Sequence, residues 1–231
     1  MSDPIAQNLA AVRARIDAAA RRAGRDPSTV RLLAVGKTKP AEAIAEAYAA
    51  GQREFGENYA QELVDKHAAL GHLPGIVWHF IGRMQSNKAR LVAKLATLVH
   101  AVDGEKLAIE LGKRAQERST PLAVLVEVNV GGESTKGGVA AADLEPILRC
   151  IESIPSLRLE GLMSIPPPAD TPEGSRPYHR ALAELRARHG GVARLPTLSM
   201  GMTDDLEPAI EEGATIVRVG TAIFGARTRV E

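Results

Sequence analysis

The sequence predicts a parallel α/β fold and, within that class, a single (β/α)8 barrel of the TIM type. Eight short apolar stretches alternate with amphipathic ones along the chain. The first, 32–36, carries no polar side chain and shows no polar–apolar alternation, which is typical of a strand covered by helices on both faces. A doubly wound open sheet is the alternative, but no GxGxxG motif follows this strand.

Composition limits the classes of function. The 231 residues carry a formal net charge of +1 and only 3% aromatic residues. We therefore expect neither nucleic acid nor an anionic membrane as a partner, because the chain has no field of one sign and few aromatic rings for base stacking. The single cysteine, Cys150, excludes an internal disulfide and fits a reducing compartment. Without a signal-peptide pattern or an apolar run of about 18 residues, a cytoplasmic protein is expected.

One domain is expected over residues 1–231, beginning with a helix at about 5–23. The apolar residues of this helix recur at helical spacing: Ile5, Leu9, Val12 and Ile16. Gly24 ends it. Only about seven residues follow Phe224, too few for an eighth outer helix. We therefore predict that the N-terminal helix covers the exterior of the barrel at this gap.

The remaining elements alternate in order. Pro40 ends the first strand and starts the next helix, because proline cannot donate to a ladder and pre-sets the helical φ. The predicted strands span 31–37, 54–57, 77–81, 98–102, 122–129, 157–164, 197–200 and 215–219. The predicted helices between them span 41–50, 59–70, 87–94, 105–118, 140–151, 178–188 and 206–212. The proline-rich stretch 165–172 is interpreted as a stiff β-to-α loop.

Lys37 stands at the carboxyl end of the first predicted strand. In parallel α/β folds ligands bind at that end of the sheet. Partial desolvation there lowers the pKa of a lysine and leaves a free amine that can form an imine with an aldehyde. A lysine that extends into solvent from a strand end is the alternative.

A phosphate site is predicted at the ends of strands seven and eight. Ser199 and Thr221 offer hydroxyls there, and the backbone N–H groups after Ser199 and Gly220 can point inward, where small residues allow close approach to phosphate oxygens. The alternative is that the glycines only make turns. Thr203 is interpreted as the cap of the following helix, since two acidic residues come after it.

Arg218 lies inside the apolar run of strand eight and needs a partner, because an unpaired buried charge is costly. Glu127 or Glu160 could pair with it, or it could donate to a ring nitrogen of a ligand. A lysine amine, a phosphate site and an arginine suit a molecule with both an aldehyde and a phosphate. Pyridoxal 5′-phosphate (PLP) is one such molecule, and a sugar phosphate bound by a Schiff-base aldolase is the other.

Five stretches carry a resemblance to a known family. They are LLAVGKTKP (32–40), FGENYAQE (55–62), WHFIGRMQSNK (78–88), EGLMSIP (160–166) and LSMGMTDDLEPAIEEGATIVRVGTAIFGAR (198–227). With them the chain resembles, over nearly its whole length, the PLP homeostasis proteins, relatives of the fold-type III alanine racemase barrel. The resemblance implies a Schiff base on Lys37, Asn58 beside the cofactor and Arg218 at the pyridine nitrogen. It also implies that Ser199, the Met200 amide, Gly220 and Thr221 hold the phosphate.

The resemblance also bears on catalysis. Alanine racemases add a C-terminal β-domain that supplies a second acid/base, and this chain is expected to lack that domain. His79, on strand three, is interpreted as a satisfied core residue, and no histidine spacing indicates a metal. A monomeric, non-catalytic protein that stores PLP and delivers it to apo-enzymes is expected, with Lys136 as a possible transient acceptor or, alternatively, a solvated loop lysine. A small PLP-dependent amino-acid racemase is the alternative function.

Overall fold

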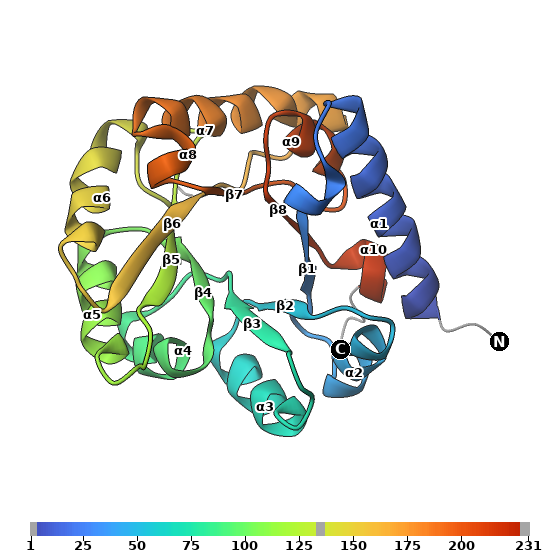
Figure 1. The fold of residues 1–231 in the computed structure, drawn as a ribbon, viewed down its shortest axis with the longest axis horizontal. Coiled ribbons are helices and arrows are strands. Elements are labelled where there is room, and N and C mark those ends of the chain that lie inside the picture. Colours follow the sequence, from blue (N-terminus) through green and yellow to red (C-terminus); the bar gives the residue numbers. More distant parts are fainter. Residues whose placement is uncertain (1–3, 133–136, 227–231) are drawn as a thin grey trace.

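Eight parallel strands close into a barrel in the computed structural model, which describes residues 4–132 and 137–226 (Figure 1). Neighbours in sequence are neighbours in the barrel, and β8 pairs with β1 to close it, with Leu33 opposite Arg218. The strands are β1 (Arg31–Val35), β2 (Glu54–Glu57), β3 (Val77–Phe80), β4 (Leu98–Val102), β5 (Leu122–Glu127), β6 (Leu157–Met163), β7 (Thr197–Ser199) and β8 (Ile216–Val219). The predicted (β/α)8 class is confirmed.

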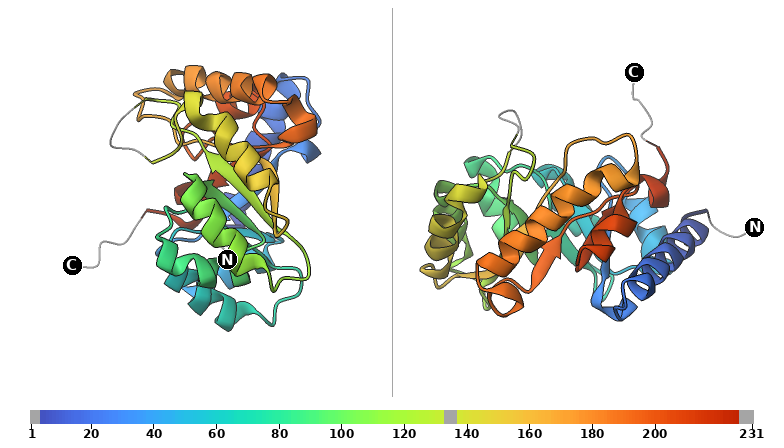
Figure 2. Two further views of the ribbon diagram at one scale, coloured as in Figure 1. Left: turned by 90° about the vertical axis from the view of Figure 1, so that its left-hand side faces the viewer. Right: turned by 90° about the horizontal axis from the view of Figure 1, so that it is seen from above.

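Helices surround the barrel on its outside (Figure 1). They are α1 (Pro4–Arg22), α2 (Ala41–Ala49), α3 (Ala60–Leu70), α4 (Ala89–Leu95), α5 (Glu105–Ala115), α6 (Leu144–Glu152), α7 (Arg176–Arg188), α8 (Gly191–Arg194), α9 (Leu206–Glu211) and α10 (Thr221–Phe224). Because every strand is parallel, all the loops that follow strands lie at one end of the barrel. Seen from the side, the loop after β6 and the short helix α10 after β8 both lie at this end of the barrel (Figure 2).

Two apolar layers hold these elements together. A small cluster fills the barrel interior and includes Leu33 and Val35 of β1, Leu125 of β5 and Met163 of β6. A much larger cluster lies between the strands and the helices, because the alternate residues of each strand point outward. The alternation on β1 places Leu33 and Val35 inside the barrel, and Lys37 follows in the turn after the strand, at the end where the strand-to-helix loops lie.

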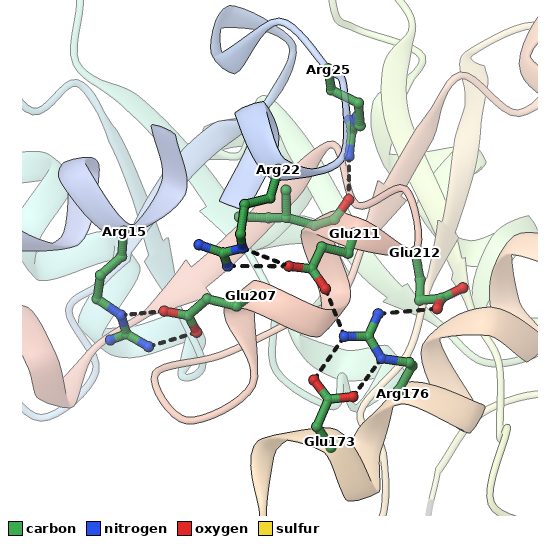
Figure 3. Close-up of polar contacts among 9 residues, drawn as sticks. Arg15, Arg22, Arg25, Glu173, Arg176, Glu207, Glu211 and Glu212 are labelled. Atoms are coloured by element: carbon green, nitrogen blue, oxygen red, sulfur yellow. Dashed lines mark hydrogen bonds and ion pairs between the residues drawn. The ribbon is translucent and has the colours of Figure 1, made fainter. Parts of the chain in front are cut away.

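Helix α1 packs against α9, α10 and α2, with Leu9, Val12 and Ile16 buried. Figure 3 shows the polar side of this contact, where arginines of α1 meet carboxylates of α9. Arg15 Nε lies 2.7 Å from Glu207 Oε1, and Arg22 Nη2 lies 3.1 Å from Glu211 Oε1. Arg176 of α7 continues the network to Glu211 at 2.6 Å. Apolar burial therefore supplies most of the contact energy, and the ion pairs fix its register.

The Arg15–Glu207 pair allows a modest prediction. Glu207→Gln is expected to lower the free energy of unfolding by about 0.5–1 kcal/mol at low salt, because the pair is bidentate but partly exposed. The loss should shrink as salt screens the pair. Urea unfolding at two salt concentrations measures it, with the exposed Glu117→Gln as the matched control. A salt-independent loss would show that the pair does not act through charge.

Candidate functional site

Lys37 follows β1 in a turn whose backbone is fixed by side chains from α3. The Nζ of Lys66 donates to the Gly36 carbonyl oxygen at 2.8 Å. On the other side of Lys37, the Thr38 amide donates to Glu62 Oε2 at 2.8 Å. Thr38 adopts a φ of 62°, which only a well-determined turn sustains for a branched residue. The backbone that carries the Lys37 amine is therefore held on both sides.

A buried cluster of charged side chains holds the backbone of this turn. Lys66 is 5% exposed and Glu57 is fully buried, and the Lys66 Nζ lies 2.8 Å from Glu57 Oε1 and 2.9 Å from Glu62 Oε2. Burial raises the pKa of Glu57 to about 7, against the opposing effect of Lys66. A Cβ on Gly36 would come within 2.7 Å of Glu57 Oε1, so a larger residue here would have to displace the end of that side chain. The sequence analysis missed this cluster, although the (i, i+4) spacing of Glu62 and Lys66 on a helix was a usable signal.

Arg218 is buried in the barrel and bonds to neutral oxygen atoms. Its Nη1 donates to the Ser199 carbonyl oxygen at 2.6 Å and to Ser199 Oγ at 2.7 Å, and its Nη2 donates to the Ser164 carbonyl oxygen at 2.9 Å. Burial lowers its pKa to about 10, opposed by Asp205 and Glu127. Of the two carboxylates considered as partners, Glu160 pairs with Arg158 instead, and Glu127 acts on Arg218 only as a nearby charge.

Ser199 and Met200 have structural partners. Ser199 Oγ accepts from Arg218 and lies 2.9 Å from His100 Nδ1, and the residue is fully buried. The Met200 amide donates to the Ile216 carbonyl oxygen at 3.1 Å. Both groups expected to bind phosphate are thus already bonded within the barrel, because the end of β7 is tied to β8. We leave them out of the phosphate site proposed below.

Gly220 and Thr221 come directly after β8, at the start of α10. Within the described ranges, no carbonyl accepts a hydrogen bond from the amides of Gly220, Thr221 or Ala222. The Thr221 residue is exposed. Three successive N–H groups beside a hydroxyl form a suitable cradle for an anion. The structure thus places Gly220 and Thr221 at the same end of the barrel as Lys37 and Arg218.

Asn58 follows β2 at this same end. Its carbonyl packs so tightly against Gly82 that a Cβ there would come within 2.0 Å of the Asn58 oxygen. Among the described residues, the buried side-chain oxygen of Asn58 has no hydrogen-bond partner, and neither has the buried hydroxyl of Ser164, which follows β6. Buried polar atoms cost free energy when unpaired, so these two oxygens fit a polar ligand. Together with the lysine, the arginine and the free amides, they suit PLP.

The structure also bears on the interpretations of His79 and Thr203. His79 is 1% exposed and bonds to His100, as expected of a core residue. Thr203 does not cap α9, because this helix begins at Leu206 and Asp205 precedes it. Asp205 instead accepts from the Met202 amide at 2.6 Å and lies 3.0 Å from His179, which fixes the loop after β7. Lys136 lies outside the described residues.

Residues 4–132 and 137–226 show neither a metal-binding cluster nor a membrane-spanning helix. No group of three or more His, Cys, Asp and Glu side chains there is placed to hold a metal ion. No helix there has the length and apolar character needed to cross a membrane.

Comparison with known proteins places this barrel in a family. The family model of the alanine racemase N-terminal domain matches residues 7–228. A pyridoxal phosphate homeostasis protein of Pseudomonas aeruginosa is 50% identical over 234 residues, covering 96% of each chain. The protein of the same name from Escherichia coli strain K12 is 48% identical, covering 96% of this chain and 97% of its own.

A solved structure agrees with these relatives. PipY of Synechococcus elongatus, solved with PLP bound, is 38% identical to this chain and superposes with a TM-score of 0.81. The match covers 96% of this chain and 100% of PipY. The chain therefore belongs to the alanine racemase N-terminal domain family and, within it, to the pyridoxal phosphate homeostasis proteins.

Proposed function

We propose that this protein binds PLP reversibly through Lys37 and serves in PLP homeostasis by storing the cofactor and passing it to apo-enzymes. One observation carries the proposal: the barrel presents a lysine, a buried arginine and unpaired backbone amides at one mouth. The names of the close relatives and the PLP bound in PipY support it. When bound, the cofactor supplies an aldehyde that a lysine amine can attack and release.

The phosphate is assigned to Gly220 and Thr221. Their amides have no acceptor within the described residues, and Thr221 adds a hydroxyl. A cradle of backbone N–H groups binds a dianion without placing a cation beside it. Reversible release favours such a site, because a lysine or arginine clamp would add charge-assisted hydrogen bonds and slow the release. Asn58, with its unpaired buried oxygen, is assigned to the side of the cofactor.

Arg218 is assigned to the pyridine nitrogen. A guanidinium only donates hydrogen bonds, so it holds that nitrogen as an acceptor, without a proton. An unprotonated ring withdraws electrons weakly, which disfavours reactions that need a strongly stabilised carbanion. This arrangement supports binding over turnover.

A role without turnover also agrees with where the side chains lie that could act as the second acid/base of a racemase. Tyr48 lies on α2, where its hydroxyl donates to the Pro74 carbonyl oxygen at 2.8 Å. Tyr178 lies on α7, on the outside of the barrel. His79 is buried and bonded to His100. These positions make the three poor candidates for a base that faces Lys37, and Tyr59, 56% exposed beside Asn58, is the remaining tyrosine to which a racemase would have to turn.

A small amino-acid racemase is the second candidate, favoured only by the racemase family fold. The carrier and the racemase are distinguished by incubating the PLP-loaded protein with each L-amino acid and measuring the D-isomer by chiral chromatography. The carrier proposal expects no D-isomer above a protein-free PLP control. Sustained turnover that Lys37→Ala removes would establish the racemase.

Transfer is tested directly by mixing the PLP-loaded protein with an excess of an apo-PLP-enzyme and following recovery of that enzyme's activity. We expect recovery with a matching loss of bound PLP from this protein. We further propose that the protein works as a monomer in the cytoplasm. The lone Cys150 fits a reducing compartment, and sedimentation velocity with and without PLP tests the monomer.

A further inference from the structure

A continuous chain of polar side chains crosses the barrel interior beside the apolar inner cluster. It starts at Glu54 on β2, passes through His79 on β3 and His100 on β4, and ends at Ser199 and Arg218 on β7 and β8. The two imidazoles lie 2.9 Å apart, from His79 Nδ1 to His100 Nε2. His79 is 1% exposed and His100 is fully buried. Two adjacent buried histidines require an explanation, since apolar side chains would fill the same space at less cost.

The chemistry of its two ends sets the direction of the chain. Arg218 can only donate, so Ser199 Oγ accepts from it, at 2.7 Å. The hydroxyl hydrogen of Ser199 is then free to go to His100 Nδ1, 2.9 Å away. At the far end the Glu54 carboxylate can only accept, and it lies 3.5 Å from His79 Nε2.

These ends leave one tautomer for each ring. A neutral imidazole has one donor and one acceptor nitrogen. If His100 accepts from Ser199 at Nδ1, it must donate from Nε2 to His79 Nδ1. His79 then donates from Nε2 toward Glu54. Burial lowers the pKa of His79 to about 3 and lowers that of His100 well below its ordinary value, so both rings stay neutral.

The chain also determines what Arg218 offers to a ligand. Nη1 gives both hydrogens to Ser199, one to its carbonyl oxygen and one to Oγ, while Nη2 gives one to Ser164. Within the described residues the Nε hydrogen and the second Nη2 hydrogen have no acceptor. If the Ser199 hydroxyl turned toward Arg218, its hydrogen would oppose the guanidinium. The histidines prevent this by taking that hydrogen.

We propose that His79 and His100 are positioning residues, which fix the Ser199 hydroxyl as an acceptor and so hold Arg218 in one orientation as the donor to the cofactor ring. This inference rests on the proposed function, because it assigns Arg218 to PLP. It explains why the barrel interior carries two histidines that are buried from solvent. It also explains why Ser199 binds to Arg218 and is not free for the phosphate.

The first experiment tests the chain without the cofactor. Long-range ¹H–¹⁵N NMR of the histidine rings in the PLP-free wild-type protein should show two rings protonated at Nε2 and not at Nδ1. These rings should not titrate from about pH 6 to about pH 8. His79→Gln and His100→Gln assign the signals. Either ring protonated at Nδ1, or titrating near an ordinary histidine pKa, would overturn the proposal.

The second experiment tests the effect on the cofactor. His100→Leu removes the acceptor for the Ser199 hydroxyl and is expected to weaken PLP binding about tenfold and shift the visible absorbance of bound PLP. His100→Gln can still accept from Ser199 and donate to His79, so it should restore both readouts. His72→Leu, at an exposed histidine, is the matched control.

The outcomes separate the two proposals. If His100→Leu and wild type give the same spectrum and affinity, the positioning role is overturned while PLP binding stands. The same conclusion follows if His100→Gln fails to restore them although it folds with a wild-type melting temperature. If the wild-type protein binds no PLP, the proposed function itself fails, and the ring tautomers still show whether the chain runs in the stated direction.

Discussion

Replacing Lys66 by methionine is expected to lower the free energy of unfolding by about 3–5 kcal/mol above about pH 7. The reason is the buried cluster beneath the Lys37 turn. Lys66 bonds to Glu57, Glu62 and the Gly36 carbonyl oxygen, and Glu57 is fully buried. Without the ammonium group, Glu57 is left as an uncompensated buried charge, and the turn loses one of its two fixed points.

The loss should depend on pH in a defined direction. The pKa of Glu57 is raised to about 7 in the folded protein, above its ordinary value of 4.5. The folded state therefore binds more protons than the unfolded state between these values, and stability falls as the pH rises through this window. Lys66 opposes the raised pKa, so its removal enlarges the fall. At about pH 5, where Glu57 holds its proton, the cost of Lys66→Met should be much smaller.

Urea unfolding at about pH 5 and about pH 8 measures both effects. Lys94→Met, at an exposed lysine on α4, is the matched control and should change stability by no more than about 0.5 kcal/mol. Adding Glu57→Gln to Lys66→Met should recover most of the lost stability at the higher pH, because the uncompensated buried charge is removed. An equal loss at both values of pH would show that the cluster acts through packing and not through charge.

Removing the Lys37 amine should abolish covalent attachment of PLP. We expect Lys37→Ala to show no visible imine band after incubation with PLP and to lose the cofactor on gel filtration. The proposed phosphate cradle at Gly220 and Thr221 is unchanged in this variant, so weak, non-covalent binding should persist at high PLP concentration. Absorbance spectra before and after desalting measure both.

Lys39→Ala is the matched control for this variant. Lys39 lies in the same turn, where its Nζ donates to the Ala226 carbonyl oxygen at 2.9 Å. Its loss should leave the spectrum unchanged. A wild-type band in Lys37→Ala, or its loss in Lys39→Ala alone, would move the attachment point to another amine.

The fold was largely predictable because one strong pattern repeats. Short apolar runs between amphipathic helices determined the order and class of the elements, and strands such as β2 and β4 have the expected bounds. Details that depend on tertiary contacts were not predictable. The first strand ends at Val35, two residues early, because side chains of α3 hold Gly36 and Thr38 in a turn.

The site was predictable only where one residue type implies one kind of chemistry. A lysine at a strand end and glycine with threonine after the last strand could be named from sequence as candidates, and they remain predictions. The interior chain could not, since His79 and His100 are 21 residues apart and meet only because β3 and β4 are neighbours. For the same reason the sequence indicated Ser199 only as a candidate phosphate ligand and gave no sign of its contacts with His100 and Arg218.

The central claim is that Lys37 is the point at which this protein holds PLP. The most direct measurement is to incubate the wild-type protein with PLP, record its visible spectrum, reduce it with borohydride and map the modified peptide by mass spectrometry. We predict a visible band that borohydride removes, and one phosphopyridoxyl group on the peptide that contains Lys37. A stable adduct on any other lysine, or no band at saturating PLP, would contradict the assignment.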